Sequence, residues 1–228
     1  MQANHSNCWY SEICDSVEGN PPCTRSNICP KYLEMSYLME ESGLPKSKQQ
    51  PITINLYDDC DEAAYERLNE IRENIVDFVD SGKNLVIASN NLGNGKTSWA
   101  VKILHKYFER IWQGNHFRVR GIFVHVPTLL IKLKDFNDPE VTKLKRRLLN
   151  ADLVVWDDIA SQEISSYDYG NLLMFIDSRI FADKSNIFTT NKVDAEDFST
   201  YVGGKLTSRI FYQSEVIKLN GIDKRGLL

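Results

Sequence analysis

Residues 84–99 read NLVIASNNLGNGKTSW, in which an apolar run is followed at once by a glycine-containing loop. Gly95, Lys96 and Thr97 fill the last three fixed positions of the pattern G-x-x-x-x-G-K-[ST], which is typical of a phosphate-binding loop between a strand and a helix. Asn90 stands where that pattern has its first glycine, and asparagine tolerates left-handed backbone better than most residues. The stretch therefore predicts a strand, a phosphate-binding loop and a helix.

The loop carries the three groups that a polyphosphate site needs. Backbone N–H groups at a helix N-terminus attract phosphate oxygens, a lysine reaches the β- and γ-phosphates, and a hydroxyl binds Mg²⁺. Lys96 and Thr97 supply the lysine and the hydroxyl. The alternative is a glycine-rich turn that carries a lysine by chance. The loop residues expected to bind ATP are Asn90, Asn91, Leu92, Gly93, Asn94, Gly95, Lys96, Thr97 and Ser98.

The composition bounds the class of protein. The chain has 228 residues, of which 42% are hydrophobic and 25% charged, as in ordinary soluble globular proteins. No stretch approaches the roughly 20 apolar residues of a membrane helix, and no leader peptide opens the chain. We therefore expect a cytoplasmic protein with no membrane partner. The net charge of −4 argues against nucleic-acid binding over the whole protein surface but permits a local basic groove.

Short apolar runs alternate with helical patterns through the C-terminal two-thirds of the chain. The runs expected to form strands are residues 84–89, 121–126, 152–158, 186–191 and 215–219. Such alternation is typical of an α/β fold with a parallel sheet covered by helices on both faces. Upstream, the apolar spacing from Ala64 to Val79 predicts one helix that ends near Gly82.

The cysteines predict a separate N-terminal module. Four of the five lie within the first 29 residues, and clustered thiols in the cytosol more often bind metal than form disulfides. About 45 residues bury too little surface to fold unaided, and Zn²⁺ binding would contribute on the order of 10 kcal/mol. His5 as a substitute ligand, an iron–sulfur cluster and no metal remain alternatives. The expected ligands are Cys8, Cys14, Cys23 and Cys29.

A proline-flanked stretch of linker composition follows this module. We therefore divide the chain into a cysteine-rich domain at residues 1–44, which includes a short helical stretch at residues 30–42, a linker at 45–57 and an α/β domain at 58–228.

Polar residues follow the apolar strands at the edge where an α/β sheet binds ligands. Asp157 is expected in the second shell of Mg²⁺, and Asp158 is expected to orient or deprotonate the attacking water. Asn191 could bind the γ-phosphate or that water. The alternatives are helix-capping roles, for the two aspartates and for Asn191 before the helix that begins near Asp194.

Two arginines are candidates for stabilising charge on the transferred phosphate. Arg209 lies in a predicted helix after the fourth strand, and Arg225 lies beyond the last strand. An arginine supplied by a neighbouring subunit would tie hydrolysis to assembly. The alternative for each is an ordinary surface arginine.

Together these stretches resemble the AAA+ ATPases of the DnaC/DnaI-like helicase-loader group, which includes IstB-type transposition helpers. The matching stretches are NNLGNGKTSWA, GIFVHVPTLLIKLK, LVVWDDIA, LLMFIDSRI, IFTTNK and GGKLTSRI…EVIKLNGIDKR. The resemblance implies a P-loop AAA+ domain without a C-terminal helical lid. It implies that Asn191 is the first sensor, Arg209 a finger acting on a neighbouring copy, and Arg225 a second-sensor-like residue. Arg179 would also face a neighbouring subunit.

The resemblance also implies partners. Members of this group grip a DnaB-type hexameric replicative helicase through an N-terminal domain, in some members a zinc-binding one, and deliver it onto single-stranded DNA. An alternative is an IstB-like helper of a DNA transposase, and another is a nucleotide-binding switch with little hydrolysis. The basic residues that could contact DNA, or form an ordinary solvated face, are Lys132, Lys134, Lys143, Lys145, Arg146 and Arg147. We interpret Cys60, His105, His116 and His125 as structural.

Overall fold

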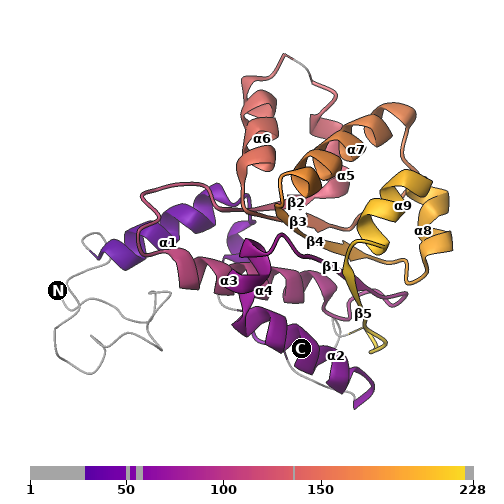
Figure 1. Ribbon diagram of the computed structural model, residues 1–228, viewed down its shortest axis with the longest axis horizontal. Coiled ribbons are helices and arrows are strands. Elements are labelled where there is room, and N and C mark those ends of the chain that lie inside the picture. The colour runs from indigo at the N-terminus through magenta and orange to yellow at the C-terminus, as the bar shows by residue number, and fades with distance from the viewer. Residues whose placement is uncertain (1–28, 50–51, 55–58, 136, 224–228) are drawn as a thin grey trace.

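Among the residues that the structure describes, five parallel strands form the central sheet, in the order β2-β3-β4-β1-β5 (Figure 1). The structure is a computed structural model that describes residues 29–49, 52–54, 59–135 and 137–223. The strands are β1 (Asn84–Ala88), β2 (Gly121–His125), β3 (Leu153–Asp157), β4 (Ser185–Thr190) and β5 (Glu215–Lys218). The parallel α/β sheet expected from the sequence is confirmed.

Helices connect the strands and cover both faces of the sheet (Figure 1). They are α1 (Pro30–Glu41), α2 (Glu62–Glu73), α3 (Ile75–Asp80), α4 (Lys96–Ile111), α5 (Val126–Lys132), α6 (Pro139–Asn150), α7 (Ser166–Phe181), α8 (Ala195–Val202) and α9 (Gly204–Phe211), with the short 3₁₀ turns η3 (Lys46–Lys48) and η4 (Asp59–Asp61). None of these helices is long and apolar enough to cross a bilayer.

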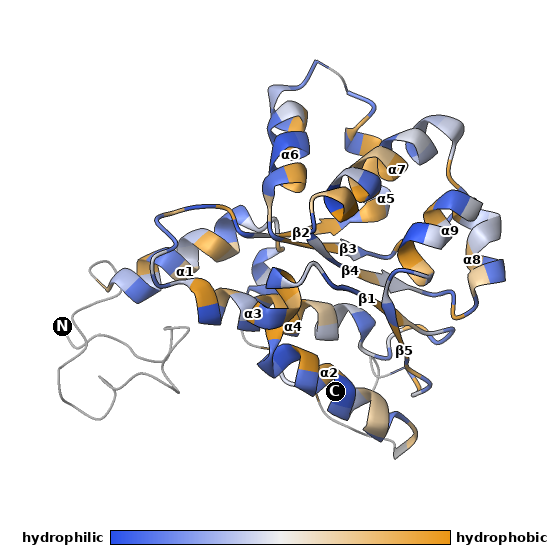
Figure 2. Ribbon diagram, in the orientation of Figure 1, coloured by the Kyte–Doolittle hydropathy of each residue, from blue (hydrophilic) through white to orange (hydrophobic). Residues whose placement is uncertain are grey.

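Alternate residues of each strand enter two different hydrophobic cores. In β1, Leu85 and Ile87 pack with α1 to α4, whereas Val86 and Ala88 pack with α5 to α9. Successive side chains of a strand point to opposite faces, so a strand that is apolar throughout must be covered on both sides. Figure 2 shows the corresponding bands of hydrophobic residues along the covering helices.

The helix expected to run to Gly82 is two helices. α2 and α3 are separated at Asn74, whose φ of −103° and ψ of 28° lie outside the helical region. The Asn74 side-chain amide donates to the carbonyl of Glu70 at 2.9 Å, and this local bond competes with continuation of the helix. The apolar face is nevertheless continuous, because Leu68 and Ile75 are both fully buried.

The helix α1 belongs to the core of the α/β domain. Met35, Leu38 and Met39 of α1 are buried in the same cluster as the strand residues of one sheet face. The backbone joins too, since Phe123 N–H of β2 donates to the Ser42 carbonyl at 2.7 Å. A boundary near residue 44 therefore does not separate two cores among the described residues. The cysteine-rich domain remains a prediction, and we now place its end before Pro30.

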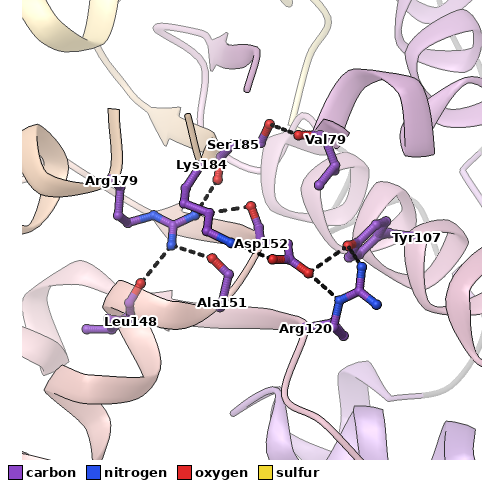
Figure 3. A network of polar contacts seen from close by, with 9 residues as sticks. All are labelled: Val79, Tyr107, Arg120, Leu148, Ala151, Asp152, Arg179, Lys184 and Ser185. Atoms are coloured by element: carbon purple, nitrogen blue, oxygen red, sulfur yellow. Dashed lines mark hydrogen bonds and ion pairs between the residues drawn. The ribbon is translucent and has the colours of Figure 1, made fainter. Parts of the chain in front are cut away.

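Arg179 of α7 is a buried structural residue, so the expectation that it faces a neighbouring subunit is wrong (Figure 3). Its guanidinium donates to the Leu148 and Ala151 carbonyls, both at 2.7 Å, at the end of α6. It also donates to the Ser185 carbonyl and to the Asn186 side chain. The last carbonyls of a helix lack partners within the helix, and Arg179 satisfies those of α6.

A second polar cluster in Figure 3 surrounds Asp152, at the amino end of β3. Lys184 Nζ lies 2.6 Å from this carboxylate, and Arg120 also pairs with it. Burial alone would raise the pKa of Asp152, but the hydrogen bonds from Lys184 and Arg120 lower it below its ordinary value. The cluster lies at the amino edge of the sheet, opposite to the edge that carries Asp157, and links the starts of β2, β3 and β4.

We expect His105 in α4 to make the protein less stable in acid. Burial lowers the pKa of His105 to about 4, so the unfolded chain, with an ordinary value near 6.5, takes up the proton first. The stability present above about pH 6.5 is then lost as the pH falls towards 4. Between pH 7 and pH 5 the loss through this group is about 2 kcal/mol. Urea unfolding of the wild type and of His105→Gln at both pH values measures it. Equal losses in the two proteins would contradict the assignment.

Candidate functional site

The carboxyl edge of the sheet brings together the ends of β1, β3 and β4. After β1, the chain passes through α4 to β2, which forms one edge strand of the sheet. After β4, it crosses to β5, which forms the opposite edge strand beyond β1. A ligand crevice is expected where connections diverge in this way. The loop at residues 89–95, Asp157 and Asn191 all lie at this edge.

The loop between β1 and α4 owes its shape to Gly93 and Gly95. Their φ angles are +67° and +103°, values that favour glycine over residues with a Cβ atom. Asn90 is not among the described residues with positive φ, so glycine is not required at its position. The missing glycine of the sequence pattern therefore does not disturb the turn. The chain enters α4 directly at Lys96, which leaves the first backbone N–H groups of that helix without helical partners.

A cleft of about 450 Å³ opens at this loop. It is lined by Lys48, Leu92, Gly93, Asn94, Gly95, Lys96, Thr97, Ser98, His125, Asp157, Asp158, Thr189 and Asn191. Most of the residues that the sequence singled out are thus brought to one cavity. Asn90 and Asn91 are not among its lining residues, and neither is Arg209.

Thr97 and Asp157 are in direct contact inside the cleft. The Thr97 hydroxyl donates to Asp157 Oδ1 at 2.7 Å, and the Thr189 hydroxyl donates to the same oxygen at 2.8 Å. Asp157 is 6% exposed, so both bonds form away from bulk water. The carboxylate therefore fixes the rotamer of the hydroxyl next to the loop. Lys96 lies beside them, with its ammonium 2.8 Å from the Asn91 carbonyl.

Asp158 is held in a conformation that is uncommon for its residue type. Its φ is +61°, and the backbone N–H of Asp158 donates to the Thr189 hydroxyl at 2.9 Å. The Asn191 side-chain amide donates to Asp158 Oδ1 at 3.1 Å, so the two predicted residues do meet. Left-handed backbone at a residue with a Cβ atom costs free energy, and such strained residues recur at functional sites. The bend turns the carboxylate into the cleft beside Asp157.

Sequence reasoning missed two charged or titratable side chains of the cleft. His125 ends β2, with its Nε2 atom 3.8 Å from Asp158 Oδ2 and its Nδ1 atom 2.9 Å from the Thr128 hydroxyl. The rule that selected Asp157 and Asn191, a polar residue at the carboxyl end of a strand, also selects His125. Lys48 belongs to the stretch interpreted as a linker, and no local pattern marks it.

The remaining predicted residues lie elsewhere. Arg209 of α9 pairs with Asp177 of α7 at 2.5 Å, and its guanidinium lies 5.8 Å from the ring of Phe181. Arg225, Cys8, Cys14 and Cys23 fall outside the described residues. Cys29 precedes α1 and forms no disulfide within the described part of the chain. In that same part no group of three or more histidine, cysteine or acidic side chains could hold a metal ion.

The polar groups that line the cleft fit a nucleoside triphosphate with Mg²⁺. The backbone amides at the start of α4 and the Lys96 ammonium suit phosphate oxygens. The hydroxyl of Thr97 and the carboxylate of Asp157 are the oxygen ligands that magnesium prefers, directly or through water.

Comparison with protein families gives one result. The model of a family described as IstB-like ATP-binding protein matches residues 36–226, which span the whole sheet and α2 to α9. No curated protein matches the sequence.

Comparison with solved structures gives the same fold. The DnaC helicase loader has a TM-score of 0.62 at 21% identity, over 73% of this chain and 94% of that one. DnaI has a TM-score of 0.65 at 18% identity, over 82% and 99% of the two chains. DnaA from Aquifex aeolicus bound to AMPPCP has a TM-score of 0.57 at 15% identity, over 73% and 48%. At these identities the similarity establishes the fold.

Proposed function

Because the chain belongs to the family of IstB-like ATP-binding proteins, we propose that it binds ATP with Mg²⁺ in the cleft at the start of α4 and hydrolyses it. The observation that carries the proposal is the contact of Thr97 with buried Asp157, beside Lys96 at the start of α4. A nucleotide switch with little hydrolysis is the weaker alternative, since the loop keeps its shape with Asn90 in it.

The loop residues, Asp157, Asp158 and Asn191 have distinct parts in this chemistry. The amides of residues 95–98 and the Lys96 ammonium bind the β- and γ-phosphates. Thr97, oriented by Asp157, would hold Mg²⁺. Bound magnesium would neutralise charge that develops on the phosphate oxygens. Asp158 accepts a proton from water or orients it, and Asn191 fixes the Asp158 carboxylate at 3.1 Å.

Lys96→Ala is expected to weaken ATP binding by about 10- to 100-fold, because hydrogen bonds to charged groups contribute about 1.5–3 kcal/mol. Titration with a fluorescent ATP analogue measures this change. Lys83→Ala, which removes an exposed lysine before β1, is the matched control and should bind like the wild type. Equal affinity of wild type and Lys96→Ala would refute the site.

We further propose that the protein loads a DnaB-type replicative helicase onto single-stranded DNA. The fold similarity to DnaC and DnaI supports this reading. A helper ATPase for a DNA transposase is the second candidate, because the matching family is described as IstB-like and the sequence resemblance includes IstB-type transposition helpers. Capture of a purified DnaB-type helicase, with and without ATP, tests the first. Retention of a transposase or duplex DNA alone would refute it and support the second.

The basic residues of α5 and α6 and the four cysteines complete the proposal. Lys143, Lys145 and Arg146 in α6 would contact the DNA backbone, which a steep salt dependence of binding would test. The thiolates of the N-terminal module would bind Zn²⁺ and form the surface that grips the helicase. Elemental analysis of protein purified without chelator would rule out zinc if it finds none.

A further inference from the structure

Asp61 binds a distant piece of backbone and does not cap its own helix. It occupies the N-cap position of α2, yet its side chain makes no capping hydrogen bond there. The Asn220 N–H donates to Asp61 Oδ1 at 2.6 Å, and the Gly221 N–H donates to Oδ2 at 2.9 Å. The residue is 1% exposed, so a buried carboxylate holds two amides that follow β5.

The same segment is held from its other side by the phosphate-binding loop. The Asn91 side-chain amide donates to the carbonyls of Asn220 and Gly221 at 2.9 and 3.0 Å. The Asn94 side-chain amide donates to the Leu219 carbonyl at 3.3 Å, and Asn94 is fully buried. Residues 219–221 are therefore clamped between Asp61 and the loop.

These two asparagines also hold the lysine of the loop. Lys96 Nζ lies 2.8 Å from the Asn91 carbonyl and 3.3 Å from Asn94 Oδ1. A continuous series of polar contacts thus runs from Asp61 through residues 219–221 and the asparagines to the Lys96 ammonium.

We propose that Asp61 is a positioning residue for nucleotide binding, acting on the phosphate-binding loop through residues 219–221. The inference rests on the proposed function, since it concerns the affinity of that loop for ATP. A carboxylate that accepts two amide hydrogen bonds is a stronger anchor than a neutral acceptor. Without it, two buried N–H groups lose their acceptor, and the segment shifts together with the asparagines that it holds.

The coupling must also act in the reverse direction. If the position of residues 219–221 changes ATP affinity, then ATP binding changes the protection of this segment by the same factor. Hydrogen exchange at the Asn220 and Gly221 amides therefore slows when nucleotide binds. In Asp61→Asn the slowing is lost, because the acceptor of those amides is altered.

A double-mutant cycle tests the proposal. Asp61→Asn and Asn91→Ala are each expected to weaken binding of a nonhydrolysable ATP analogue about 5- to 10-fold, in the lower range of typical coupling effects. The double variant is expected to lose about 10-fold, far less than the product of the two, because both act through one segment. Asp138→Asn is the matched control. It removes the carboxylate that caps α6 through the Glu140 N–H, and its affinity stays within about twofold of the wild type.

The outcomes separate this inference from the proposed function. A wild type that binds no nucleotide overturns both. A wild type that binds, with single effects below twofold or with effects that multiply in the double variant, overturns the inference alone. Asn91 is exposed, so Asn91→Ala should fold even if Asp61→Asn does not. The ATP affinity of Asn91→Ala and the hydrogen exchange of its Asn220 and Gly221 amides then test the inference.

Discussion

Asp158→Asn should lower the rate of ATP hydrolysis by roughly 10²- to 10⁴-fold, the usual contribution of a general base, with little change in ATP affinity. Asparagine has the same shape as aspartate and tolerates the φ of +61° found at this position. Its side-chain oxygen can still accept the hydrogen bond from Asn191. The substitution therefore removes the capacity to accept a proton and leaves the local geometry in place.

Steady-state kinetics of Asp158→Asn separates chemistry from binding. The expected pattern is a large fall in kcat with KM near that of the wild type, since Asp158 does not touch the bound phosphates in the proposed mechanism. Glu163→Gln removes an exposed carboxylate five residues further along the chain and serves as the matched control. A variant that keeps the wild-type kcat would exclude Asp158 as the base and direct attention to His125, another proton acceptor in the cleft.

Features encoded by adjacent residues could be predicted from the sequence. All five strands and the helix after the loop were expected, because strand and helix periodicity and the glycine–lysine–threonine pattern are local. Asp158 and Asn191 were expected at one edge for a topological reason, and they lie in hydrogen-bonding contact.

Features that depend on contacts between distant residues were missed. Lys48 lines the cleft, but it lies in a stretch whose composition is typical of a linker, so the sequence did not indicate it. The burial of α1 was missed because the cysteine-rich segment before it suggested a separate domain. The resemblance implies that Arg179 faces a neighbouring subunit, yet the carbonyls that end α6 provide it with buried acceptors within the chain. Asp61 has the sequence of an ordinary helix cap, and only the folded chain brings Asn220 and Gly221 to it.

Arg209 is the site of the largest effect that we expect on turnover. Its side chain is 33% exposed and lies outside its own cleft, and its guanidinium is near the ring of Phe181, which is 75% exposed. If Arg209 completes the cleft of a neighbouring copy, Arg209→Ala should reduce ATP hydrolysis by the assembled protein about 10³- to 10⁵-fold. ATP affinity of the single chain should not change.

Asp177→Asn provides the matched control, because it breaks the same ion pair and leaves the arginine in place. We expect it to hydrolyse ATP at least as fast as the wild type.

A mixing experiment tests action between copies directly. Arg209→Ala has an intact cleft and Lys96→Ala an intact arginine, so each variant alone should be inactive. When the two variants are mixed, the intact cleft of Arg209→Ala can receive the intact Arg209 of Lys96→Ala, and ATP hydrolysis should be restored. If the mixture stays inactive while both variants still assemble, the arginine does not act on a neighbour. Its position beside Asp177 and Phe181 would then reflect surface packing within one chain.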